Sequence, residues 1–346
     1  MALALLLLAL SPASALAART SAFRSTLFVF VQGIGSALTS YQAATQGGDG
    51  SDPHFFRNGH LGTYLQSQGY PNTRYLEYSY APLSFHDTGQ PQPYTCKDTY
   101  NYPFASHITA LSQQVSSAVQ SHPNTDVYLI GHSMGGIVAF GYLASLLEHV
   151  GNAVPLPPNG SRLKGIITLD SPLGGVTSNG DYGKLIFLRS LPCEGFDALW
   201  NTVAVAQMQA LFQTATERSA RGATASIVQA ILNGGALSNQ KVANDAKQAR
   251  ITVVTIGNTS DLFWRPSVCN KTLKVHMQDF RSTQWLQDEG NTSGVYSRMF
   301  TSGSLNCLLG LLNLANHSDV FDTLAVEQAV VHIVNGRTPS ELLPAP

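Results

Sequence analysis

The ten residues Val127–Gly136, VYLIGHSMGG, decide the fold class of this chain. A short apolar, β-branched run leads directly into Gly-His-Ser-Met-Gly, and apolar residues at helical spacing follow at once. Such a turn between a strand and a helix strains the central serine and presents its hydroxyl at the end of a sheet. Glycine is needed at Gly131 and Gly135 because a Cβ atom there would collide with the neighbouring strand and helix. The stretch predicts that Ser133 is a nucleophile.

Outward from this turn, apolar β-rich runs alternate with amphipathic segments. Strands are expected over residues 26–31, 74–78, 126–130, 164–169 and 251–256, with a further candidate at 273–277. Helices are expected over 55–68, 104–122, 134–150 and 320–334, and residues 81–103 are expected to form an irregular surface loop. This alternation predicts an α/β fold with a mostly parallel sheet flanked by helices.

The alternation stops between residues 174 and 250, where helices are expected over 198–212 and 224–232. A helical insertion in an α/β chain is most simply a cap on the carboxyl edge of the sheet, where ligands bind. The alternative is two ordinary crossover helices with long loops. We therefore expect one domain over residues 19–346 that contains a cap insertion at 174–250.

Composition excludes several classes of protein. Only 12% of the 346 residues are charged, about half the usual share, whereas 44% are hydrophobic, which argues against a disordered chain. The net charge of −1 provides no basic surface for nucleic acid, and the scarcity of Glu and Lys argues against a coiled coil. A compact protein with a neutral polar surface is expected.

The first 18 residues carry no charge and contain a Leu/Ala run, a Ser-Pro break and an Ala-x-Ala pattern at 15–17. These features predict a signal peptide over residues 1–18 and a secreted protein. An uncleaved membrane anchor is the alternative, which the early proline disfavours.

An oxyanion needs hydrogen-bond donors, and the Gly-rich stretch that follows the first strand, Gln32–Ser36 (QGIGS), is suited to supply one. We expect the backbone N–H groups of Ile34 and Met134 to form the pair. The alternative is a phosphate-binding loop of a dinucleotide fold, but the third glycine and the acidic partner of that fingerprint are missing. No cofactor is expected.

An activated serine also needs a base and a carboxylate, which follow it in the order Asp or Glu, then His. His317 is assigned as the base because it lies in a polar loop before the last helix, whereas His276 and His332 fall within predicted regular elements. Asp261, just beyond the strand at 251–256, is assigned as the acid, with Asp170 as the alternative. His132 is expected to be structural.

Four features together resemble the α/β-hydrolase-fold lipases and esterases, most closely the secreted bacterial lipases and the GPI inositol-deacylase-like group. They are the turn at 129–136, the stretch TLDSPLGG at 168–175, Asp261 after a strand and His317 before the final helix. The resemblance spans roughly residues 26–334 and is weakest over the cap. It implies an α/β-hydrolase fold. It also implies that Asp319, two residues after the base, could bind calcium as in some bacterial lipases, although an N-cap of the last helix is the preferred role.

The four cysteines are expected to form two disulfides in an oxidising compartment. Cys269–Cys307 would join the acid loop to the base loop, and Cys96–Cys193 would fasten the cap. Five N-glycosylation patterns occur, and two of them lie beside the assigned acid and base, where a glycan would obstruct the site. This favours a bacterial exporter over a eukaryotic secretory pathway.

The expected function is that of a secreted serine hydrolase that cleaves carboxylic esters through an acyl-enzyme on Ser133, with Asp261 and His317. Its partner would be a small-molecule or lipid ester, with transient contact with a lipid surface and no nucleic acid. An amidase, a thioesterase, a glycolipid deacylase or a non-catalytic binding protein remain alternatives. The oligomeric state is not predicted.

Overall fold

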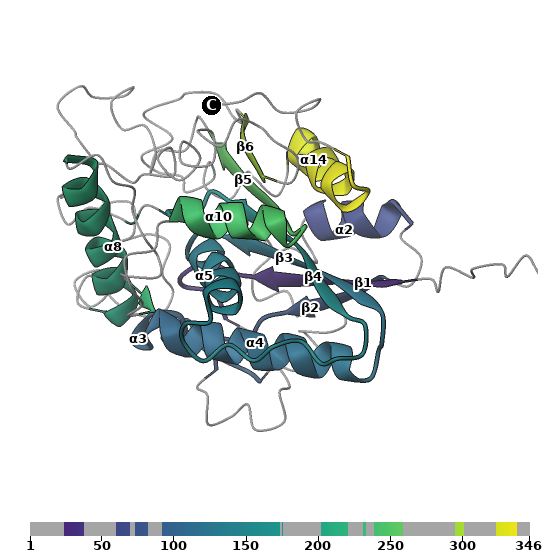
Figure 1. Ribbon diagram of the computed structural model, residues 1–346, viewed down its shortest axis with the longest axis horizontal. Coiled ribbons are helices and arrows are strands. Elements are labelled where there is room, and N and C mark those ends of the chain that lie inside the picture. Colours follow the sequence, from purple (N-terminus) through teal and green to yellow (C-terminus); the bar gives the residue numbers. More distant parts are fainter. Residues whose placement is uncertain are drawn as a thin grey trace, which may run out of the picture.

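The centre of the sheet in the computed structural model pairs β1 (Ser25–Val31) with β3 (Thr125–His132), so that Ser25 lies opposite Thr125. The structure describes residues 24–37, 60–69, 73–81, 92–173, 175, 202–220, 231–232, 239–258, 295–300 and 323–337. Figure 1 shows the strands and helices of these segments.

In the described segments, six strands form one sheet in the order β2-β1-β3-β4-β5-β6, and every neighbouring pair is parallel. The other four strands are β2 (Thr73–Glu77), β4 (Arg162–Leu169), β5 (Thr252–Asn258) and β6 (Val295–Phe300). The predicted parallel α/β sheet is confirmed. The sixth strand was not among the predicted ones, and the candidate strand at 273–277 lies outside the described residues.

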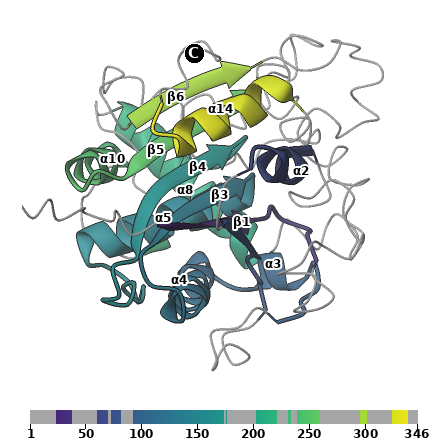
Figure 2. The same ribbon diagram turned by 90° about the vertical axis from the view of Figure 1, so that its right-hand side faces the viewer.

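Helices cover both faces of the sheet, as Figure 2 shows. One face carries α4 (Phe104–Gln120), α5 (Met134–Glu148) and α10 (Asn239–Gln248), and the other carries α2 (His60–Ser67) and α14 (Leu324–Val334). Two separate apolar clusters result, one on each face. The inner strands β1, β3, β4 and β5 contribute to both clusters and are therefore buried on both sides, which explains their nearly continuous apolar sequences.

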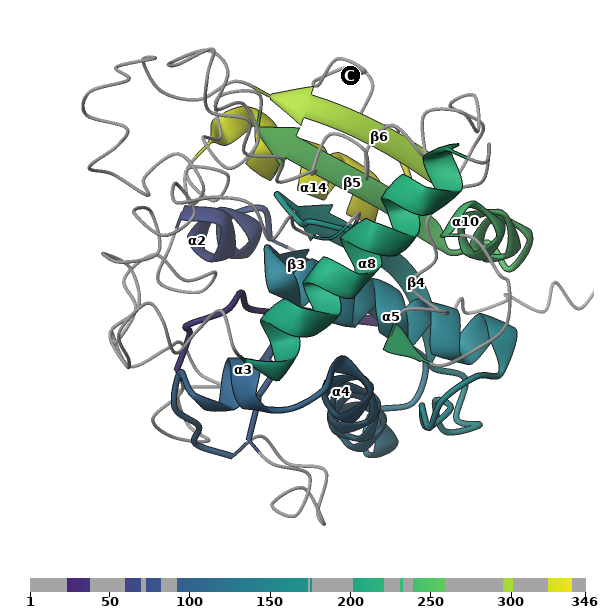
Figure 3. The ribbon, with the colours of Figure 1, turned by 90° about the vertical axis from the view of Figure 1, so that its left-hand side faces the viewer.

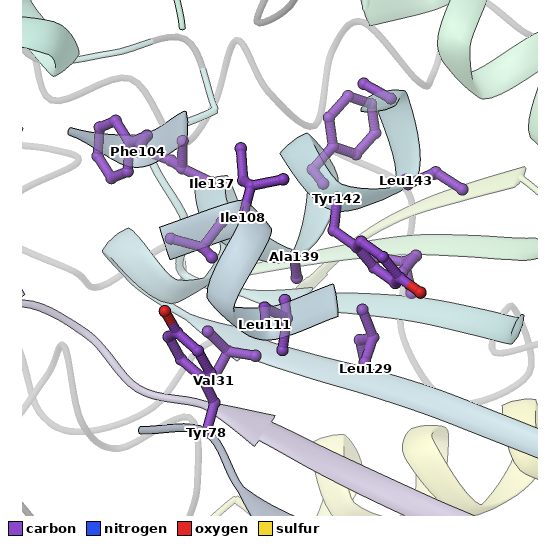
Figure 4. Close-up of a cluster of buried hydrophobic side chains, with 14 of the residues drawn as sticks. Val31, Tyr78, Phe104, Ile108, Leu111, Leu129, Ile137, Ala139, Tyr142 and Leu143 are labelled. Atoms are coloured by element: carbon purple, nitrogen blue, oxygen red, sulfur yellow. The ribbon is translucent and has the colours of Figure 1, made fainter. Parts of the chain in front are cut away.

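The larger cluster fastens α4 and α5 to the centre of the sheet (Figure 4). Val31 and Leu129 of the strands and Ile108 and Ile137 of the helices are fully or almost fully buried. Gly141 allows the two helices to approach closely, because a Cβ atom there would lie 2.4 Å from the Cδ1 atom of Ile108. This packing holds the first turn of α5 against the ends of β1 and β3.

Helix α8 (Val203–Ala220) lies in front of the carboxyl ends of the strands, where the cap was expected (Figure 3). Its buried residues, Ala204, Val205, Met208 and Leu211, belong to the same cluster as α4 and α5. Helix α10, at the end of the predicted insertion, packs on α5 and β5 and is thus a crossover helix that flanks the sheet. The limits of the cap stay a prediction, because residues 176–201 and 221–230 lie outside the described part.

Two local expectations differ from the structure. The predicted loop at 81–103 contains a short helix, α3 (Asp98–Asn101). The N-cap of α14 is Thr323, whose carbonyl accepts hydrogen bonds from the N–H groups of Val326 and Glu327. The expectation that Asp319 caps this helix is therefore wrong.

Within the described ranges, no helix is both long and apolar enough to cross a membrane.

Candidate active site

Ser133 connects the end of β3 to the start of α5 with a strained backbone, at φ 51° and ψ −127°. L-residues rarely adopt this region, and holding one there costs about 1–3 kcal/mol. The backbone N–H of Ser133 donates to the Leu169 carbonyl over 2.9 Å, and the Ser133 carbonyl accepts from the Gly136 N–H over 3.1 Å. The strained turn predicted from the sequence is confirmed.

The glycines around Ser133 are needed for close backbone contacts. A Cβ atom on Gly135 would lie 2.0 Å from the carbonyl oxygen of Val31, and one on Gly131 would lie 2.6 Å from the Cα atom of Gly136. Both distances are far below van der Waals contact with backbone atoms that cannot move alone. The collisions expected from the sequence are thus present on the strand side and on the helix side.

The turn lies where the chain reverses its direction across the sheet. From β1 the chain proceeds to β2 on one side, and it then returns past β1 to β3 and β4 on the other. The loops that leave β1 and β3 therefore diverge, and ligands of open α/β sheets bind in the crevice at such a switch point. Ser133 and the Gly-rich stretch after β1 both lie at this switch point.

The stretch Gln32–Ser36, which we call the oxyanion loop, lies directly against Ser133. A Cβ atom on Gly33 would be 3.0 Å from the Cβ atom of Ser133 and 3.4 Å from its Oγ atom. In the part of the chain that the structure describes, the backbone N–H groups of Ile34 and Met134 have no hydrogen-bond partner. The Met134 amide opens α5, where the positive end of the helix dipole favours an anion.

Hydroxyl groups beneath the oxyanion loop bind it from the side of the protein core. Tyr80 OH donates to the Gln32 carbonyl over 2.6 Å, and Ser36 Oγ donates to the Gly33 carbonyl over 3.0 Å. Tyr94 OH lies 2.9 Å from Ser36 Oγ and 3.3 Å from the Gln32 side-chain oxygen. Burial raises the pKa of Tyr80 and Tyr94 well above the usual value, so both remain neutral hydroxyl donors. These residues were not predicted.

A further contact holds the other end of the loop. The Gly35 N–H donates to Thr99 Oγ1 over 3.0 Å, and the Thr99 hydroxyl donates to the Cys96 carbonyl over 2.6 Å. Cys96 is fully buried and is not a free thiol. The other three cysteines lie outside the described residues, so the predicted pairing stays a prediction.

The assigned acid and base, Asp261 and His317, also lie outside the described residues, as does His276. Asp261 follows the last residue of β5, Asn258, by three positions. The third histidine, His332, is in the last turn of α14, and Tyr128 OH, from the middle of β3, donates to the Val334 carbonyl over 3.2 Å. The last turn of α14, which contains His332, is therefore next to the side chain of Tyr128, a residue five positions before Ser133.

Asp170, the alternative acid, follows β4 immediately and is 1% exposed. Its φ of 45° is in the left-handed region, and its N–H donates to the Ile256 carbonyl over 2.8 Å. It adjoins Leu169, which binds the Ser133 amide, so it stays close to the turn. His132 is buried, with 6% exposure.

Among the described residues, no group of three or more His, Cys, Asp or Glu side chains could hold a metal ion. Asp319 lies outside those residues, and the calcium role that the resemblance implies for it stays a prediction.

A parallel sheet with a strained Gly-x-Ser-x-Gly turn between a central strand and a helix at its switch point is the arrangement of the α/β-hydrolase fold. The predicted fold is confirmed. Several solved structures are distantly similar to this chain. A lipase-esterase related protein from Clostridium acetobutylicum is 13% identical, with a TM-score of 0.39 over 90% of this chain and 95% of its own.

A highly thermostable carboxyl esterase from Bacillus coagulans is 13% identical, with a TM-score of 0.41 over 90% of each chain. Zea mays acyl-protein thioesterase 2 is 14% identical, with a TM-score of 0.37 over 85% of this chain and 94% of its own. No protein-family model and no curated protein matches the chain. Because one fold serves many chemistries, the activity is argued below from the chain's own residues.

Proposed function

We propose that this protein is a serine hydrolase that cleaves carboxylic esters through an acyl-enzyme on Ser133. One observation carries the proposal: Ser133 is held at φ 51° and ψ −127° at the carboxyl end of β3, with the oxyanion loop against it. Strain of this kind persists where the surrounding structure enforces it, and it is concentrated at active sites. A serine with only a structural role gains nothing from such a backbone.

In the first half of the reaction, His317 removes the proton of the Ser133 hydroxyl as the oxygen attacks the ester carbonyl carbon. Asp261 orients the imidazole and stabilises its protonated form. The N–H groups of Ile34 and Met134 stabilise the oxyanion. The C–O bond of the ester then breaks, and the alcohol leaves with the proton from His317. Water repeats the attack on the acyl-enzyme and releases the acid and free Ser133.

The arrangement of the neighbouring elements supports the two assignments outside the described residues. Asp261 is three positions beyond Asn258, the last residue of β5, a span of at most about 11 Å. The hydrogen bond between Tyr128 and the Val334 carbonyl holds the C-terminal end of α14 beside the middle of β3. This is consistent with a position nearer the edge of Ser133 for the N-terminal end, which His317 precedes by seven residues.

Apolar residues near the serine support an acyl substrate. Met134 and Leu173 are buried in the same cluster as Met208 of α8, and the partly exposed Ile34 packs against that cluster. Of these residues only Ile34 is partly exposed, and a hydrocarbon chain in contact with it would gain about 0.8 kcal/mol for each CH₂ group that it buries. Export through the signal peptide at 1–18, disulfides Cys96–Cys193 and Cys269–Cys307, and transient contact with a lipid surface belong to the same proposal.

A fluorophosphonate probe tests the nucleophile, with mass spectrometry to locate the adduct. We expect the wild-type protein to be labelled at Ser133 and to hydrolyse p-nitrophenyl esters, with a preference set by acyl length. Ser133→Ala should lose both properties, and Asp261→Asn and His317→Ala should lose at least about 10³-fold in kcat. Hydrolysis that survives in Ser133→Ala would overturn the proposal, whereas a larger loss in Asp170→Asn than in Asp261→Asn would transfer the acid role.

A further inference from the structure

The direction of the Ile34 N–H is set by a neighbouring carbonyl. In a trans peptide the C=O and the N–H point in opposite directions, and the described residues contain no cis peptide bond. The peptide between Gly33 and Ile34 has its carbonyl bonded to the Ser36 hydroxyl. The N–H of the same peptide therefore points away from Ser36. The Ser36 hydroxyl, which binds the Gly33 carbonyl, thus determines the direction of the Ile34 N–H.

The Ser36 hydroxyl is in turn fixed by Tyr94. Ser36 donates its proton to the Gly33 carbonyl, so its oxygen accepts from the Tyr94 hydroxyl 2.9 Å away; the Gln32 side-chain oxygen, at 3.3 Å, is the more distant acceptor for the same Tyr94 proton. Both side chains are buried, each with 4% exposure, so water cannot replace either bond easily. The chain of bonds from Tyr94 through Ser36 to Gly33 polarises each member in the same sense. It leaves the Ser36 hydroxyl one rotamer that satisfies both neighbours.

A second hydroxyl acts in the same way on the preceding peptide. Tyr80 OH holds the Gln32 carbonyl at 2.6 Å, which turns the Gly33 N–H away from the core. Two consecutive carbonyls of the oxyanion loop are thus held on the core side. Since Gly33 itself lies against Ser133, the free face of the loop is the one next to the nucleophile.

We infer that Ser36 is a positioning residue for the oxyanion site, and that Tyr94 acts through it. The pair holds the Gly33–Ile34 peptide in the orientation that offers the Ile34 N–H to the tetrahedral intermediate, before any substrate is bound. This inference rests on the proposed acyl transfer at Ser133. It assigns no contact with substrate to either side chain.

The test compares Ser36→Ala and Tyr94→Phe with a matched control, Tyr78→Phe. Tyr78 is also fully buried, but its hydroxyl donates to the His107 carbonyl on α4 over 2.9 Å and lies 3.5 Å from the His107 Nδ1 atom, so the phenylalanine removes no bond to the oxyanion loop. Each purified full-length variant is assayed for kcat and KM with a p-nitrophenyl ester and for inhibition by an alkyl boronic acid. The boronate forms a tetrahedral adduct with the serine, so it reports on the oxyanion site.

We expect Ser36→Ala to lower kcat by about 10- to 100-fold, with KM within about twofold of wild type, because the loss is confined to the transition state. The inhibition constant of the boronic acid should rise by a similar factor. Tyr94→Phe should lower kcat by about 3- to 10-fold, again with KM nearly unchanged. The double variant should lose no more kcat than Ser36→Ala alone. Tyr78→Phe should keep its kcat.

Each other result has a definite meaning. Wild-type protein without labelling at Ser133 would overturn the proposed function and this inference with it. A labelled, active wild type with Ser36→Ala within twofold in kcat would overturn the positioning role alone. Where Ser36→Ala fails to fold, Tyr94→Phe decides, because it keeps the aromatic ring, and a kcat equal to that of Tyr78→Phe would overturn the inference.

Discussion

Gly33 and Ser133 are so close that a methyl group on Gly33 would lie 3.0 Å from the Cβ atom of the serine and 3.4 Å from its hydroxyl oxygen. The serine backbone cannot retreat, because its amide is bonded to the Leu169 carbonyl. The oxyanion loop and the serine are therefore fitted to each other across two different strands. A change in either one displaces the other.

Gly33→Ala is expected to lower kcat/KM by about 10-fold or more, since small displacements of a catalytic group have large effects. Esterase assays and thermal melts test this. Gly69→Ala is the control: its φ of 66° makes alanine strained, but nothing lies within 4 Å of the new atom. It should cost about 1 kcal/mol of stability and leave kcat/KM unchanged. Equal kcat/KM values for Gly33→Ala and Gly69→Ala would contradict the close contact between Gly33 and Ser133.

Ser133→Gly is expected to be more stable than Ser133→Ala, although both are inactive. Glycine adopts positive φ without steric cost, whereas alanine keeps the strain of the serine backbone. The difference should be about 1 kcal/mol after the entropy that glycine loses on folding. Urea unfolding of the two variants measures it. Identical midpoints would show that the backbone of Ser133 is not strained.

Alkaline pH should reveal the buried hydroxyl of Tyr142. This side chain is fully buried, and its oxygen has no hydrogen-bond partner among the described residues. Burial raises the pKa of Tyr142, so above about pH 10 the unfolded chain releases this proton while the folded chain retains it. The contribution of Tyr142 to the free energy of unfolding is fully present below the pKa that this tyrosine has in the unfolded chain. It falls as the pH rises toward the pKa in the folded protein, by about 1.4 kcal/mol per pH unit for one such group.

Between about pH 10 and 11, the free energy of unfolding of Tyr142→Phe should therefore fall less steeply with pH than that of the wild type. The two slopes should differ by about the value given above. At pH 7 its free energy of unfolding should be equal or higher, because an unpaired buried hydroxyl is removed. Urea melts at each pH provide the comparison. An unchanged slope would mean that the hydroxyl already ionises in the folded protein.

The contact between α8 and α4 should contribute to stability but not to chemistry. Gln207 of α8 accepts a hydrogen bond from the Phe104 N–H over 2.8 Å, at the first turn of α4, where backbone N–H groups lack partners. Gln207→Ala should lower the free energy of unfolding by about 1 kcal/mol. Gln207→Glu retains an acceptor and should recover most of it. A change in kcat for short-chain esters would contradict this assignment.

Local sequence patterns predicted the fold and the strained serine, because each depends on residues that are close together in the chain. The turn at 131–135 has its strand and its helix on either side, so the segment carries its own structural context. The edge strand β6 was missed because its sequence, VYSRMF, lacks the continuous apolar run of the inner strands. Thr323 and Asp319 are both suitable N-cap residues, and the sequence offers no means to choose between them.

The hydroxyls beneath the oxyanion loop could not be predicted from the sequence. Ser36 and Tyr94 are 58 positions apart, and Tyr80 is 48 positions from Gln32. No spacing rule connects them, since their contact depends on how the segment after β2 returns to the end of β1. Serine and tyrosine are also common residues that carry no chemical signature by themselves. Such contacts become visible only in three dimensions.

The pairing of β1 with β3 has a consequence for how the protein folds. Ser25 and Thr125 are 100 positions apart, and closing so long a loop makes formation of the sheet centre slow and cooperative. A chain that has completed only β3, α5 and β4 has the motif but not the neighbour that fits against it. Ser133 therefore meets the oxyanion loop only once β1 has paired with β3, and a chain that has folded β3, α5 and β4 alone has no complete candidate site.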